Sequence, residues 1–147
     1  MKLLQIAGLL IAFLAAHPAP AQAADEAELR TIVAKFATTK NFRETEAVVR
    51  ELAATGEPAV ERPLSALAEG NLSFRKADNA VFIISERGGG QATLFDPLSG
   101  ETVGETSSRD LAKVKVNNGL RRTIRDVLGT LTLGSPDPAV RLAAAET

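Results

Sequence analysis

Residues 46–70 read EAVVRELAATGEPAVERPLSALAEG, and they set the expected architecture. Apolar residues recur at helical spacing on both sides of Gly56-Glu57-Pro58. A glycine is typical of a helix C-terminus, and a proline suits the first turn of the next helix. Asn41, with Glu44 three residues on, predicts the N-cap of the first helix. Pro63 predicts a kink or a late start in the second.

An amphipathic helix is expected upstream, over residues 24–37. Its first turn is rich in acidic residues, which the helix dipole favours. Its apolar positions recur at i, i+3, i+4 and i+7, so they share one face. These positions are Leu29, Ile32, Val33 and Phe36.

The N-terminal 23 residues have the three parts of a secretory signal. Lys2 supplies a positive start, Ile6–Ala16 is an apolar run, and Ala21-Gln22-Ala23 is a small-x-small cleavage site. The run is shorter than the roughly 20 residues that span a bilayer. We therefore expect residues 1–23 to be a signal peptide and the mature chain to be exported. An uncleaved N-terminal anchor is the alternative.

Downstream of the helical pair, residues 72–105 change to short β-prone runs. Turn signals separate the runs: Asp78-Asn79, Gly88-Gly89-Gly90 and Asp96-Pro97-Leu98-Ser99-Gly100. This pattern predicts a small antiparallel β-meander. Such a sheet is marginal alone, so we expect one of its faces to lie on the helices.

Helical periodicity returns after the meander. Ser107 or Ser108 is expected to cap a short turn through Leu111-Ala112-Lys113, and Asn117 or Asn118 a longer helix that ends at Gly134. A last helix is expected from Asp137 onward. The chain stops inside that helix, so we expect a domain over residues 24–147 that is truncated at its C-terminus.

The composition narrows the possible chemistry. The chain has no Cys, Tyr or Trp, and its one histidine, His17, lies in the expected signal. Thiol nucleophiles, Ser-His-Asp triads and the common histidine metal sites are therefore excluded from the mature part. The whole chain has a formal charge of -1, and loss of Lys2 with the signal leaves the mature part at -2, which gives no global argument for nucleic acid. We expect no enzymatic activity, no cofactor and no metal.

A basic stretch is the main candidate for recognition. It runs from Arg109 to Arg125, with Asp110 as its only acid. An acidic partner surface or an anionic headgroup is one interpretation, and a solvated helix face is the other. Aromatic residues are not interleaved with it, which argues against nucleic acid. The candidate partner contacts are Arg121, Arg122 and Arg125.

Three smaller motifs have simple alternatives. The triple glycine at 88–90 lacks the spacing of a phosphate-binding loop, so a hairpin turn is favoured. Asn117-Asn118 is either a recognition pair or a helix cap. Ser107 or Ser108 with Lys113 has the composition of a Ser-Lys pair, but no cleft is indicated around them.

Two resemblances extend this interpretation. Residues 46–70 and SPDPAVRLAAAE (135–146) resemble HEAT-type helical repeats, which implies helix pairs that stack on one another. The order of segments, together with KVKVNNGLRRTIRDVLGTLTLGSPDPAVRLAAAE (113–146), resembles the extracytoplasmic N-terminal region of urea-type ABC transporter permeases, in the branched-chain amino acid permease class. These permeases continue into a membrane-spanning bundle, which the chain does not contain. No site residue is therefore carried over.

The expected fold is α+β and mostly helical, with HEAT-like hairpins and a small β-meander insert. The expected function is that of the N-terminal extracytoplasmic domain of a urea permease, with a structural or partner-docking role. Other transporter subunits or the solute-binding protein are the expected partners, and the location is periplasmic or at the outer face of the inner membrane. A free-standing periplasmic HEAT-like adaptor is the alternative.

Overall fold

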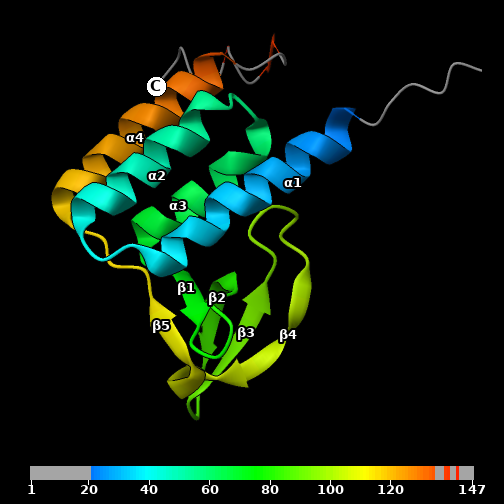
Figure 1. The fold of residues 1–147 in the computed structure, drawn as a ribbon, viewed down its shortest axis with the longest axis vertical. Helices are drawn as coiled ribbons and strands as arrows, with labels where there is room; N and C mark the ends of the chain where they lie inside the picture. Colours follow the sequence, from blue (N-terminus) through cyan, green and yellow to red (C-terminus); the bar gives the residue numbers. More distant parts are fainter. Residues whose placement is uncertain (1–20, 135–137, 140–141, 143–147) are drawn as a thin grey trace, which may run out of the picture.

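The computed structural model describes the backbone of residues 21–134, 138–139 and 142. Within these residues a helical layer sits on one side of a five-stranded antiparallel sheet (Figure 1). The α+β class is therefore confirmed. Residues 1–20 of the expected signal over residues 1–23, and most of the expected last helix, lie outside the described residues.

Four α-helices form the upper layer. They are α1 (Ala21–Ala34), α2 (Phe42–Ala54), α3 (Glu61–Glu69) and α4 (Asn118–Leu133). The 3₁₀ turn η1 (Lys35–Thr38) extends α1, and η2 (Pro58–Val60) leads into α3. Among the described residues, no helix is both long and apolar enough to cross a membrane.

The helix starts follow the capping signals of the sequence. The Asn41 Oδ1 accepts the Glu44 N–H at 3.0 Å, and the Asn117 Oδ1 accepts the Leu120 N–H at 2.8 Å. Gly70 ends α3 in the left-handed conformation, with φ of 81°. The late start expected near Pro63 is confirmed, because η2 precedes α3.

The sheet has the strand order β4-β3-β2-β1-β5. Its strands are β1 (Leu72–Arg75), β2 (Val81–Arg87), β3 (Gln91–Phe95), β4 (Thr102–Ser107) and β5 (Leu111–Lys113). The 3₁₀ turn η3 (Ser108–Asp110) joins the two edge strands, β4 and β5. If the sheet were flat, its two edge strands would lie about 19 Å apart. The link between them can span only about 14 Å. The sheet must therefore curl.

Each face of the curled sheet covers an apolar core. The main core lies between the helices and the upper face, and includes Phe36, Leu52, Leu64, Leu72 and Ile124. A smaller core lies inside the curl on the other face. Its buried members are Phe82, Ile84, Ala92, Leu94 and Leu111.

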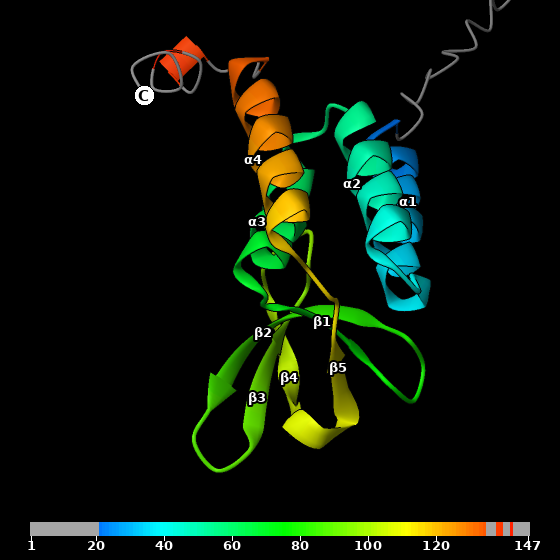
Figure 2. The same cartoon turned by 90° about the vertical axis from the view of Figure 1, so that its left-hand side faces the viewer.

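The prediction of HEAT-like hairpins is wrong. In a helical repeat, the two helices of a hairpin pack on each other. Here α4, about 50 residues downstream, packs on both α2 and α3, which make few contacts with each other. Figure 2 shows α3 beside α4 and α1 beside α2. The sheet, and not a neighbouring repeat, covers the remaining apolar side of the helices.

A second expectation is also wrong, because residues 111–113 form a strand and not a helical turn. β5 pairs with β1 in the register Ser73↔Lys113 and Phe74↔Ala112. The expected Ser107 cap is present, but it begins only η3. The partner strand of β5 lies almost 40 residues upstream, so no local pattern signals the pairing.

Candidate functional site

A cavity of about 430 Å³ lies where the helical layer meets the β5 edge of the sheet. One wall comes from the junction of η1 and α2, and the other from β1, β5 and the segment that leads to α4. Residues 39–42 join two helical segments, whereas residues 112–115 carry the chain out of the sheet. The lining residues are Phe36, Thr39, Lys40, Asn41, Phe42, Thr45, Phe74, Ala112, Lys113, Val114 and Lys115.

The inner part of this cavity is apolar. Phe36 is fully buried behind it, and Phe74 and Val114 contribute from the sheet. Phe42, the first residue of α2, is 43% exposed at its rim. An exposed aromatic side chain beside buried ones gives the cavity an apolar surface that another molecule can cover.

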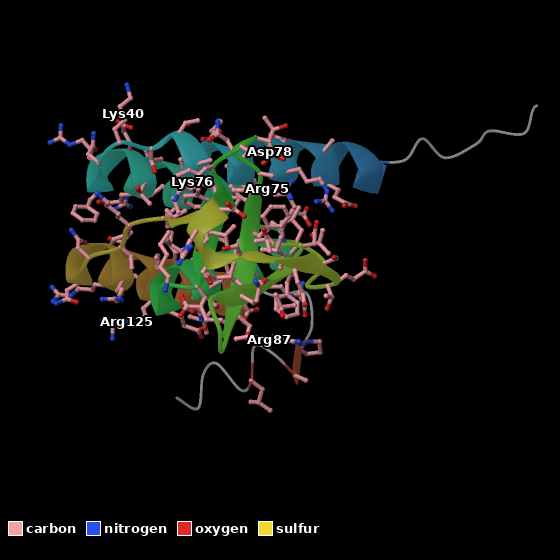
Figure 3. The ribbon with its side chains drawn as sticks, turned by 90° about the horizontal axis from the view of Figure 1, so that it is seen from below. Lys40, Arg75, Lys76, Asp78, Arg87 and Arg125 are labelled. Atoms are coloured by element: carbon pink, nitrogen blue, oxygen red, sulfur yellow. The ribbon has the colours of Figure 1, made fainter. Side chains whose placement is uncertain are left out.

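The rim of the cavity is cationic, and no carboxylate lines it. Lys113 Nζ forms an ion pair with the Glu86 carboxylate at 3.0 Å. The side chains of Lys40 and Lys115 form no ion pair with any residue that the structure describes. Figure 3 shows Lys40 projecting from the outer end of α2 into solvent. The N-terminus of α2 also carries a partial positive charge.

The polar groups of the cavity wall are already engaged in capping. The Asn41 Nδ2 donates to Glu44 Oε1 at 2.7 Å, and the Lys40 N–H donates to Glu44 Oε2 at 2.8 Å. The Thr45 hydroxyl bonds the Asn41 carbonyl and the Thr39 hydroxyl. The Lys40 and Lys115 ammonium groups are therefore the polar side-chain groups of the site that form no ion pair among the described residues.

The three arginines expected as partner contacts do not line this cavity. The Arg121 Nε donates to the Ala68 carbonyl at 2.9 Å, which ties α4 to the end of α3. Arg122 and Arg125 are exposed on α4. Arg125 lies on the opposite side of the molecule from Lys40 (Figure 3).

Of the residues in the other motifs, Lys113 alone lines the cavity. Gly88-Gly89-Gly90 is the hairpin turn between β2 and β3, and the Gly90 carbonyl accepts the Ser108 N–H at 2.9 Å. The Ser107 hydroxyl accepts the Arg109 N–H, and Lys113 pairs with Glu86, so they form no Ser-Lys pair with each other. Asn117 is the cap of α4, and the Asn118 side chain accepts a bond from Arg121.

Asp96 joins the sheet to the helical layer. Burial alone raises the pKa of this carboxyl, but hydrogen bonds from Arg30 and from the Ser99 and Leu98 N–H groups outweigh burial, and the pKa is lowered. The Arg30 Nη1 lies 2.7 Å from Asp96 Oδ2. These partners hold the turn between β3 and β4 in place, so we assign Asp96 a structural role.

Sequence reasoning missed the cavity for a physical reason. Its two walls are some 70 residues apart in the chain and meet only when β5 pairs with β1. One local signal was present: Lys40 and Phe42 flank the capping residue Asn41, so they sit at an exposed helix start.

Comparison with known proteins gave no match to any protein family, curated protein or solved structure. The described residues also contain no group of three or more histidine, cysteine or carboxylate side chains arranged to hold a metal ion.

Proposed function

We propose that this chain is the extracytoplasmic N-terminal domain of a urea-type ABC transporter permease, and that it acts by docking a protein partner. One observation carries the proposal. The stretch that resembles the permeases begins at Lys113 and includes Val114 and Lys115, which line the cavity. The permease-like segment and the lysine-rimmed cavity therefore share residues.

A binding role fits the chemistry of this site better than a catalytic one. Its free polar groups are flexible lysine ammonium ions at the rim, and its interior is aromatic and aliphatic. Protein interfaces commonly have this arrangement, in which an apolar centre is buried on binding and charged groups at the rim steer the partner. The solute-binding protein or another transporter subunit is the proposed partner.

Uptake of radiolabelled urea by the source cells tests the proposal. An in-frame deletion of the codons for residues 24–133 leaves the N-terminal export signal and everything downstream in place. We expect the deletion to reduce uptake to the level of passive diffusion, and the intact gene to restore it. Unchanged uptake would contradict the transporter assignment and leave a free-standing periplasmic adaptor as the account of the same surface.

A further inference from the structure

The outer edge of β5 carries free main-chain groups. The Val114 N–H donates to the Leu72 carbonyl at 3.0 Å, and the Lys76 N–H donates to the Asp110 carbonyl at 2.9 Å. In an antiparallel pair, hydrogen-bonded and non-hydrogen-bonded residues alternate. With Lys113 opposite Ser73, the Lys113 N–H and C=O therefore point away from β1, toward the open edge.

The cavity lies directly beside this edge. Ala112 of β5 and Val114, which follows the strand, both line the cavity. Successive side chains of a strand point to opposite faces of a sheet. A strand added outside β5 would therefore direct every second side chain toward the helical layer, where Phe42 and Phe74 line the space. A volume of about 430 Å³ is within the usual range for a binding pocket.

The charge at the edge selects the occupant. Lys40 and Lys115 flank the cavity and form no ion pair among the described residues, whereas Lys113 is paired with Glu86. The Glu44 carboxylate bonds the Lys40 N–H and the Asn41 side chain at the rim, so the three lysines still outnumber the two carboxylates near it. Pairing β5 with β5 of a second copy would bring the lysines of both copies together, which is unfavourable. A segment with acidic residues among its apolar ones complements both the rim and the interior.

We infer that the partner adds an extended acidic segment as a sixth strand along β5, with its apolar side chains in the cavity beneath Phe42. Main-chain bonds to Lys113 give this mode its affinity, and the cavity with Lys40 and Lys115 gives it its specificity. The inference rests on the proposed docking function and specifies its partner. A competing explanation is that lysines on an edge strand only prevent aggregation.

Selection of ligands from a displayed library of random nine-residue peptides tests the inference. The target is the purified protein, expressed from the full 147-residue reading frame. We expect the enriched peptides to share acidic residues and apolar residues at alternate positions. Enrichment of no sequence, or of basic ones, would overturn the inference and favour edge protection.

Matched variants locate the binding. Lys40→Glu with Lys115→Glu should weaken binding of the enriched peptide by about tenfold or more, because like charges then face each other. Arg87→Glu with Arg125→Glu reverses the same number of charges at positions away from Lys40 (Figure 3), and breaks only the exposed pair between Arg87 and Glu105. It should leave binding unchanged. Equal loss in both variants would show nonspecific charge attraction and overturn the inference.

Hydrogen exchange of the Lys113 amide tests the strand addition itself. This N–H should exchange rapidly in the free protein and be protected when the enriched peptide is bound. Binding without protection at Lys113 would contradict strand addition. These measurements use purified protein, so their outcome does not depend on urea uptake. Failure of strand addition and failure of the proposed transport role can therefore be told apart.

The same purified protein also tests whether a second copy of the chain, and not an acidic partner, binds at β5. The β4 edge carries Glu105 and the exposed Val103, and it could pair with β5 of another molecule. Sedimentation without peptide should show a monomer over a wide concentration range. If the protein instead forms head-to-tail oligomers whose size grows with concentration, and Lys40→Glu with Lys115→Glu abolishes them, then β5 binds a second copy. That result would overturn the inference.

Discussion

At the scale of single residues, the structure distinguishes side chains that the sequence presents as equivalent. Asn117 and Asn118 are adjacent amides, but only Asn117 accepts the N–H of Leu120 and caps α4. Arg121 and Arg122 are adjacent cations, but only Arg121 bonds the Ala68 carbonyl. One member of each pair stabilises the fold, and its neighbour serves as a control.

Asn117→Ala should lower the free energy of unfolding by about 1 kcal/mol, because the α4 N-terminus loses its side-chain acceptor. Asn118→Ala removes only a long, exposed bond to Arg121 and should change it by less than about 0.5 kcal/mol. Urea denaturation of both variants measures the difference. Equal effects would contradict the assignment of Asn117 as the cap.

Arg121→Ala should lower the free energy of unfolding by about 1–2 kcal/mol, because a charged donor to the last turn of α3 is lost. Arg122→Ala, which removes an exposed side chain on the same turn, should be close to neutral. The same denaturation assay measures both. A neutral Arg121→Ala would mean that α3 and α4 do not depend on this bond.

At the scale of elements, α4 and β5 organise the domain. Ile124 of α4 is fully buried among the helices, whereas Leu133 near its end is 55% exposed. The helix therefore packs against α2 and α3 within the helical layer, and it does not begin a separate repeat. β5, which immediately precedes α4 in the chain, anchors the start of that helix to the sheet by pairing with β1.

Ile124→Ala should lower the free energy of unfolding by about 2–4 kcal/mol, because it opens a cavity where α4 meets the main core. Leu133→Ala removes a similar volume at an exposed position and should cost less than about 0.5 kcal/mol. Thermal and urea unfolding compare the two. A small effect of Ile124→Ala would contradict the packing of α4 on α2 and α3.

The sequence was informative wherever the cause of structure was local. Asn41 was identifiable as a cap and the α4 cap was narrowed to Asn117 or Asn118, because a cap is recognised from residues a few positions apart. The four strands β1–β4 follow turn signals that neighbour them in the chain. The pairing of β5 with β1 and the position of α4 depend on contacts across about 40 to 50 residues. The cavity depends on both, so it could not be predicted from periodicity.

At the scale of the whole molecule, Asp96 links the two layers. Arg30 of α1 reaches the turn between β3 and β4 through this carboxylate. The partners of Asp96 lower its pKa in the folded state. A group with a lowered folded pKa stabilises the protein above its unfolded pKa, and that contribution disappears as the pH falls through the folded value.

Asp96→Asn should therefore be less stable than the wild type at about pH 7, and the difference should shrink as the pH falls below about 4, the pKa of an unperturbed aspartate. Its size at neutral pH should stay under about 1 kcal/mol, because Arg30 is 46% exposed and solvent screens the pair. Urea denaturation across this pH range measures it. A difference that grows on acidification would contradict the sign.

Photo-crosslinking in the source cells tests most directly whether this domain docks a transporter partner at the β5 edge. A photoreactive phenylalanine analogue replaces Phe42 at the cavity rim, and in a control it replaces Arg87. We predict that illumination joins the position-42 protein to a urea-transporter subunit or to the solute-binding protein, identified by mass spectrometry, whereas the position-87 protein forms no such product. Crosslinks to neither, or equal crosslinks from both positions, would contradict the account.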